Sequence, residues 1–145
     1  MLFRSLAKYL ADQNPEAFAA SPLARECGSA SNVSAEALAC HFRSGDDWAS
    51  QVIDGSARAL GCTLALIHLC CAVEDFFVTG GFATALGADF GLRVGHHAAH
   101  SAWPTDIDWS RAVHILDPNV DYGLTGAALI PLFAAPGSTM AASCG

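Results

Sequence analysis

Basic residues are scarce in this sequence. Lys and Arg together number seven against 14 Asp and Glu, which gives a formal net charge of −7 over 145 residues. A nucleic-acid-binding protein needs a basic face, and no cluster of Lys and Arg occurs here to form one. The sequence therefore predicts a protein with no nucleic-acid partner.

Long hydrophobic runs are also absent. The longest is CTLALIHLCCAV, residues 62–73, whereas a membrane-spanning helix needs roughly 20 apolar residues. Near the N-terminus, Lys8 and Asp12 interrupt the apolar stretch that a secretory signal would require. We therefore expect no membrane partner.

The six cysteines lack the paired C-x-x-C spacing of many metal and redox sites. They stand at positions 27, 40, 62, 70, 71 and 144. The adjacent Cys70 and Cys71 fall in a strand-like run, which favours buried, reduced thiols over a disulfide framework. Reduced cysteines predict a cytoplasmic protein. If the chain is an effector, the compartment is the cytoplasm of its host.

Apolar residues, in contrast, are abundant. Hydrophobic residues make up 52% of the chain and charged residues 14%, enough to build a core. The length fits one domain, which we place at residues 1–133. Residues 134–145, AAPGSTMAASCG, read as a loose C-terminal tail.

Hydrophobic periodicity predicts three helices in the first half of the chain, over residues 1–13, 35–42 and about 48–60. Ser34 is placed to cap the second helix, and Gly61 follows the third as a stop signal. Acidic residues stand just before the third helix, where their negative charge interacts favourably with the positive N-terminal end of the helix dipole.

Strands are predicted mostly in the second half. They are a buried strand over residues 63–69, a hairpin within 76–86 turning at Gly80-Gly81, and short strands over 91–94 and 111–116. Helices followed by strands favour an α+β fold. We expect N-terminal helices packed on a small, mostly antiparallel sheet.

The opening letters Met1-Leu2-Phe3-Arg4-Ser5-Leu6-Ala7 carry the most specific motif. They resemble the start of the ovarian-tumour (OTU) family of deubiquitinating cysteine proteases, Asp-Gly-Asn-Cys-Leu-Phe-Arg-Ala/Ser-Leu-Ala. Two later segments, WASQVIDGSARALGCTLALIHL and HILDPNVDYGL, look like further OTU elements. The resemblance implies a papain-like fold, a hydrolase ancestry, and a ubiquitin or ubiquitin-like partner.

The departures from the OTU pattern fall on its catalytic positions. Met1 stands where the family has its cysteine nucleophile, and Asp121 stands where it has its histidine. A thioether cannot form a thiolate, and an aspartate is a poor base near neutral pH. We therefore expect a pseudoenzyme, a degenerate or truncated copy that retains partner binding, and the sequence leaves enzymatic activity open.

The chain can also be aligned in a second register within the papain-like superfamily. In this register it resembles bacterial effector proteases of the YopT type. Gly95-His96-His97-Ala98 looks like their histidine strand, and Asp117-Pro118-Asn119 looks like their turn. In this register His96 or His97 is the base and Asp117 orients it. The nucleophile is again missing from the head of the first helix.

Alternatives from other classes stay open. The first is an active cysteine hydrolase that uses an internal cysteine with His97 or His114 and Asp117. The second is a small non-enzymatic interaction protein of viral or effector origin, in which these residues have no catalytic role. Both residues also have purely structural interpretations, in which Asp117 belongs to a turn and His114 is a half-buried residue of the sheet. A metal site at His96, His97 and His100 would need a helix, and the flanking residues favour a loop, so we predict no metal and no cofactor.

Overall fold

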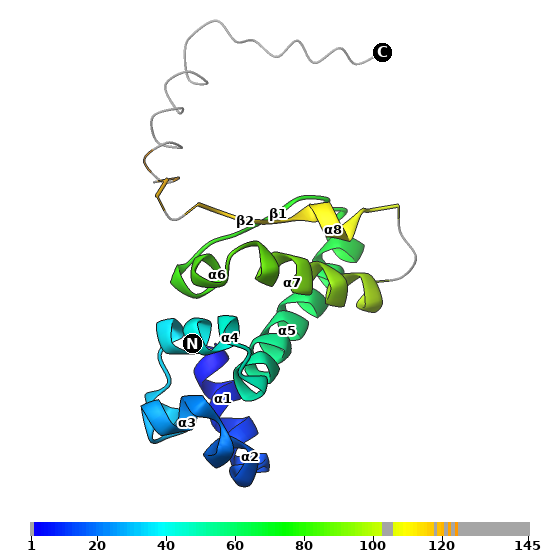
Figure 1. Ribbon diagram of the computed structural model, residues 1–145. Helices are drawn as coiled ribbons and strands as arrows, with labels where there is room; N and C mark the ends of the chain where they lie inside the picture. The colour runs from blue at the N-terminus through cyan, green and yellow to red at the C-terminus, as the bar shows by residue number, and fades with distance from the viewer. Residues whose placement is uncertain (1, 103–105, 118, 121, 123, 125–145) are drawn as a thin grey trace, which may run out of the picture.

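The computed structural model describes residues 2–102, 106–117, 119, 120, 122 and 124. This part of the chain is mostly helical and contains one two-stranded sheet, so the coarse α+β prediction holds (Figure 1). Met1, Asp121 and the predicted tail 134–145 lie outside the described residues.

The elements follow one another with short connections. The first half comprises α1 (Leu2–Gln13), α2 (Pro15–Ala20), α3 (Pro22–Cys27), the 3₁₀ turn η1 (Ala30–Asn32), α4 (Ala35–Arg43) and α5 (Asp47–Cys71). The second half comprises β1 (Phe76–Val78), α6 (Gly81–Leu86), α7 (Ala88–Ser101), α8 (Trp109–Ala112) and β2 (Val113–Ile115).

Side-chain caps explain where several helices begin. Ser34 Oγ accepts a hydrogen bond from the Ala37 amide at 3.0 Å, which confirms the predicted cap of α4. Asp46 caps α5, because its Oδ1 accepts from the amides of Trp48 and Ala49 at 2.9 and 3.2 Å. These bonds satisfy amides that have no partner within the helix.

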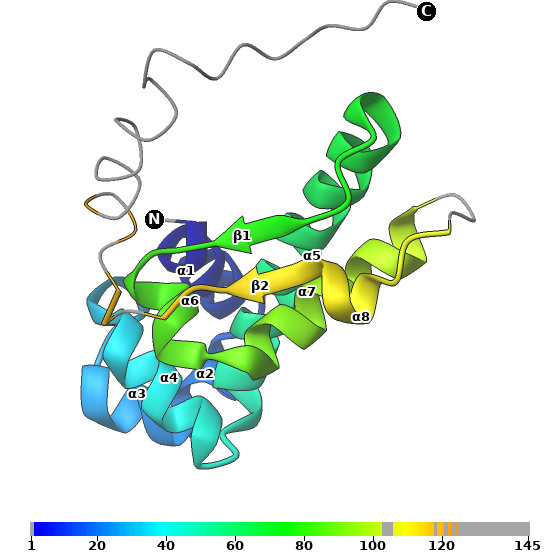
Figure 2. The ribbon, with the colours of Figure 1, turned by 90° about the horizontal axis from the view of Figure 1, so that it is seen from above.

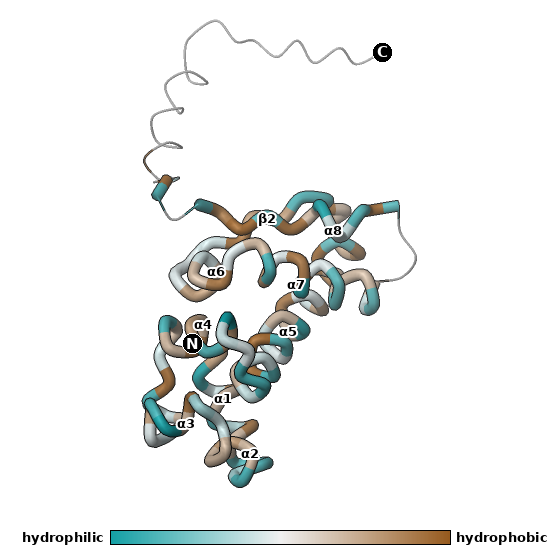
Figure 3. The backbone as a smooth tube through the Cα atoms, viewed as in Figure 1, coloured by the Kyte–Doolittle hydropathy of each residue, from teal (hydrophilic) through white to brown (hydrophobic). Residues whose placement is uncertain are grey.

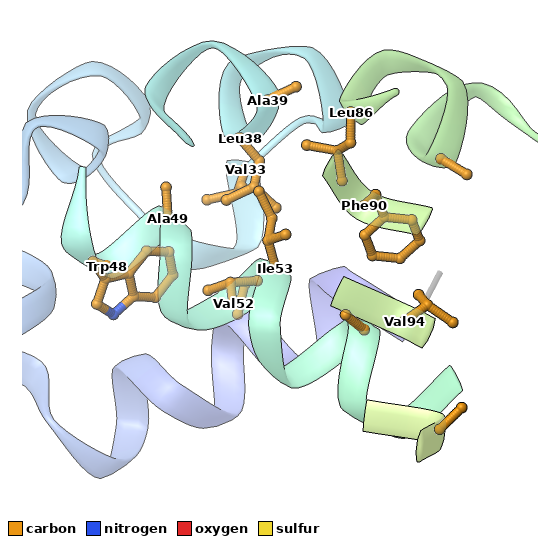
Figure 4. Packing of buried hydrophobic residues seen from close by; sticks show 14 of the residues in the cluster. Val33, Leu38, Ala39, Trp48, Ala49, Val52, Ile53, Leu86, Phe90 and Val94 are labelled. Carbon is orange, nitrogen blue, oxygen red and sulfur yellow. The ribbon is translucent and has the colours of Figure 1, made fainter. Parts of the chain in front are cut away.

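The core forms where α5 meets the other helices. Trp48, Val52 and Ile53 project from α5 and are buried, as the sequence predicted. Figure 4 shows Ile53 beside side chains from the α4 region, with side chains of α6 and α7 on its other side, whereas Trp48 lies apart from them and its ring contacts Phe18. The partners labelled there are Val33, Leu38, Ala39, Leu86, Phe90 and Val94. Burying each large side chain contributes about 1.5–3 kcal/mol.

Helix α5 continues ten residues beyond the predicted stop at Gly61. The buried strand predicted over residues 63–69 is therefore wrong. Gly61 allows close packing instead: a Cβ there would lie 2.6 Å from the Val94 oxygen and 2.8 Å from the Ala98 nitrogen. The glycine thus brings the α7 backbone against α5 rather than ending the helix.

The sheet is parallel. β1 pairs with β2 in the register Phe76↔Val113 and Val78↔Ile115, and the two strands lie side by side beyond α7 (Figures 1 and 2). The predicted mostly antiparallel sheet is wrong, because the described strands pair in parallel. The predicted hairpin at Gly80-Gly81 is also wrong, because α6 begins at Gly81. A crossover through α6, α7 and α8 makes the parallel pairing possible.

Residues 91–101 form most of α7, so the strand over 91–94 and the loop after it are wrong. Close packing again explains the glycines: a Cβ on Gly95 would meet the Trp109 carbonyl oxygen, and one on Gly91 would lie 3.2 Å from Ile115 Cγ1. The strand over 111–116 is confirmed in part, since β2 covers its centre and α8 precedes it.

The C-terminal end of α5 extends beyond the core. Leu66, Leu69, Cys70 and Cys71 are exposed there, so the prediction that the adjacent thiols are buried is wrong. Among the described helices, α5 alone has the length and apolar composition to cross a membrane. Core helices of soluble proteins can have the same length and composition, so this is weak evidence for a membrane span. The absence of a membrane partner stays a prediction.

Candidate functional site

An open pocket of about 630 Å³ lies at the end of the sheet where the strands begin. It is bounded by the last turn of α5, the segment before β1, and the chain from 106 into β2. Its lining comprises His68, Glu74, Asp75, Asp106, Ile107, Asp108, Arg111, Ala112 and His114. Figure 3 shows the hydrophilic stretch between α5 and β1 that forms part of this rim. We call it the acidic pocket.

His114 lies on β2 and faces a carboxylate. Its Nε2 is 3.0 Å from Asp75 Oδ1, and its ring stacks on Phe77 with centroids 4.9 Å apart. The register Phe77↔His114 sets both contacts, because it places the residue before β1 close to β2. The His114 side chain is 42% exposed, so solvent and ligands reach it.

His68 is held by the end of its own helix. Its Nδ1 donates to the Val73 carbonyl oxygen at 2.8 Å, since a carbonyl can only accept. The chain can turn back to make this bond because Ala72 adopts a left-handed conformation with φ of 53°. The His68 ring also meets the Trp109 ring edge-on, with centroids 5.6 Å apart.

Negative charge predominates in the acidic pocket. Four carboxylates, those of Glu74, Asp75, Asp106 and Asp108, face the single guanidinium of Arg111. The Ser110 hydroxyl and amide donate to Asp108 and lower the pKa of that carboxyl. The pocket therefore favours a cationic ligand near neutral pH.

The other predicted site residues lie elsewhere. His97 on α7 places Nε2 3.0 Å from Asp54 Oδ1 on α5. Asp117 Oδ1 accepts from the Asn119 amide at 2.8 Å and from its side chain, as in the predicted turn. His97 and His114 thus each have a carboxylate partner other than Asp117, and the orienting role of Asp117 stays a prediction.

No cysteine in the described part of the chain is hydrogen-bonded to a histidine. Cys62 Sγ lies 3.2 Å from Ser101 Oγ. Burial, and then the charge of Glu26, raise the pKa of the Cys27 thiol, which opposes thiolate formation. This geometry gives no support to an internal cysteine nucleophile.

The head of α1 belongs to a separate, more apolar pocket of about 470 Å³. Phe3 stacks on Phe82 there, with centroids 4.7 Å apart, and Val78 at the end of β1 is also in the lining. His114 does not line this pocket. The described N-terminal end of α1 and His114 therefore line different pockets.

The sequence patterns predict little of the acidic pocket. The predicted strand over residues 63–69 contains His68, and the predicted site residues do not include Asp75 or Asp106. A detectable signal existed: acidic residues stand immediately before Phe76 and in the Asp106-Ile107-Asp108 segment before α8. Recognising that they converge required the parallel pairing of β1 with β2.

The described lining lacks the groups that cysteine and serine hydrolases use as nucleophiles. Within the described residues, the acidic pocket has imidazoles, carboxylates and one guanidinium but no thiol or hydroxyl. A cysteine or serine hydrolase needs its thiol or hydroxyl within hydrogen-bond reach of the base. The described lining therefore offers the His114–Asp75 pair no thiol or hydroxyl to deprotonate.

Comparison with known proteins identifies no relative. No protein-family model, no curated protein and no solved structure matches this chain.

Proposed function

We propose that this chain is a non-catalytic, OTU-like binding domain that holds a basic segment of a ubiquitin-like partner in its acidic pocket. The observation that carries the proposal is the lining itself, in which four carboxylates oppose one guanidinium and no thiol or hydroxyl is present among the described residues. Such a pocket attracts a positively charged segment, and its described lining has no thiol or hydroxyl that would attack a peptide or isopeptide bond.

The partner class rests on the resemblance of the first seven residues to the OTU family. One feature of the chain supports that assignment. Residues 2–13 form a helix whose Phe3 packs near the end of β1, as a papain-like lead helix packs near its sheet. Met1 departs from the family pattern at the nucleophile position, and because a thioether cannot supply a thiolate, we propose a non-catalytic domain.

Exposed ion pairs set the expected strength of binding. Each contributes about 0.2–1 kcal/mol, so removing two carboxylates should weaken binding by about 2- to 30-fold. Salt should weaken it as well, because the Debye length falls to about 10 Å at 0.1 M.

The test is an NMR titration of the isotope-labelled chain with unlabelled ubiquitin. We expect amide shifts around Asp75 and Asp106, weaker binding by the Glu74→Gln/Asp106→Asn double variant, and no change for Asp47→Asn. Asp47 is a matched control because it is exposed at the opposite end of α5. Glu74 and Asp106 make no hydrogen bond to other described residues, so the double variant should fold normally.

Two results would overturn the proposal in different ways. If ubiquitin causes no shifts at millimolar concentration while an Arg-rich peptide does, the pocket binds basic segments and the ubiquitin-like partner is wrong. If a ubiquitin probe with a vinyl or propargyl warhead labels the chain, the domain is catalytic, and mass spectrometry will identify the cysteine.

A further inference from the structure

Two histidines lie one turn apart on the exposed side of α7. His96 and His100 are four residues apart, a spacing that places side chains on the same helix face. Their ring centroids are 4.2 Å apart with an interplanar angle of 47°. Both residues are exposed. A ligand from solvent can therefore reach both rings at once.

The hydrogen bonds of His100 fix which ring nitrogen is available. Its Nδ1 lies 2.8 Å from the His96 carbonyl oxygen, which can only accept, so Nδ1 carries the proton. In the neutral ring Nε2 then keeps its lone pair. A bond from the second ring nitrogen to a backbone carbonyl is the usual support of a metal-binding histidine.

His96 has no competing partner within the described ranges, since neither of its ring nitrogens is hydrogen-bonded there. The neighbouring His97 differs, because its Nε2 is engaged by Asp54. The nearby guanidinium of Arg93 also pairs with Asp54, at 3.4 Å, which offsets its charge next to the histidine pair.

We propose that His96 and His100 form a chelate site for a late first-row divalent metal ion such as Ni²⁺, Cu²⁺ or Zn²⁺. Imidazole nitrogens suit these ions, whereas Mg²⁺ and Ca²⁺ prefer oxygen ligands. No group of three or more His, Cys, Asp or Glu side chains among the described residues is arranged to hold a metal. The site is therefore a two-imidazole chelate in which water completes the coordination.

The helix itself makes the site specific to the folded chain. In α7 the backbone holds the two imidazoles one turn apart, whereas in the unfolded chain their separation varies. A ligand that binds the native state better than the unfolded state raises the melting temperature.

The test is calorimetric titration of the full, tag-free chain with NiCl₂. We expect one Ni²⁺ equivalent whose affinity falls about tenfold or more in His96→Gln and in His100→Gln, since loss of even an outer-shell partner costs roughly 10- to 100-fold. His97→Gln is the matched control on the same helix and should bind like the wild type. Ni²⁺ should raise the melting temperature of the wild type and of the control only.

A second measurement on the unaltered chain makes the test independent of the variants. Paramagnetic Ni²⁺ should broaden the amide signals of residues 96–100 before those of other segments. The proposal is overturned if both pair variants bind as tightly as the wild type, if binding disappears when the thiols are alkylated, or if the broadening centres outside α7.

Discussion

Asp46 offers the sharpest test of how the N-terminal helices are joined. The side chain is buried and connects two segments. Its Oδ1 accepts from the amides of Trp48 and Ala49 at the start of α5, and its Oδ2 accepts from the Leu23 amide of α3 at 3.0 Å. Replacing it with alanine removes the cap and leaves the buried Leu23 amide without this partner.

The expected loss follows from these two effects. An N-cap aspartate contributes about 0.5–2 kcal/mol relative to alanine. A buried amide left without a partner costs about 1–3 kcal/mol. Asp46→Ala should therefore lower the free energy of unfolding by about 1.5–5 kcal/mol. That is a large fraction of the roughly 5–15 kcal/mol by which domains are stable.

Urea unfolding followed by far-ultraviolet circular dichroism measures this loss. Asp46→Asn should lie between the wild type and Asp46→Ala, because the amide keeps one acceptor oxygen and cannot serve both segments. Asp47→Ala is the control: it removes an exposed charge near the helix N-terminus, worth about 0.3–1 kcal/mol. Equal losses for Asp46→Ala and Asp47→Ala would refute the link between α3 and α5.

Two further predictions concern packing and charge. Gly61→Val should destabilise the chain by about 1–3 kcal/mol in urea unfolding, because its Cβ would press on the α7 backbone. Gly81→Val, with nothing within 4 Å of its Cβ, should stay within about 0.5 kcal/mol of the wild type; equal effects would contradict the close approach. Ser110→Ala should raise the pKa of Asp108 in an NMR titration, because the hydroxyl bond that lowers this pKa is lost. A lowered carboxyl pKa stabilises the fold above the unfolded-state pKa, and this contribution is lost as the pH falls through the folded-state pKa. Ser110→Ala should therefore reduce stability above the unfolded-state pKa of Asp108 and lose less stability on acidification than the wild type; an unmoved titration would exclude the hydroxyl as the cause.

Local signals in the sequence predict α1, α4 and the first part of α5, but not α2, α3 or η1. Ser34 before an amphipathic segment gave the start of α4, and the spacing of Val52 and Ile53 gave the buried face of α5. These features depend on residues within one or two turns of each other. A local pattern is sufficient to identify them.

The chain after residue 60 is predicted poorly, in part because the sequence interpretation takes Gly61 as a helix stop and Gly95 as a loop signal. Gly61, Gly91 and Gly95 lie inside helices at points where another backbone or side chain comes close. A short apolar run such as 63–69 also fits a buried strand and a buried helix equally well. Only tertiary contacts separate these interpretations, and the same contacts bring Asp75 to His114.

The parallel pairing of β1 with β2 has a consequence for the order of folding. The two strands can meet only after the chain between them has returned across the molecule as α6, α7 and α8. Contacts between residues far apart in sequence carry a loop-closure entropy and form slowly unless earlier structure shortens the loop. We expect docking of α7 on α5 at Gly61 to supply that earlier structure, so that the acidic pocket forms after the helical body.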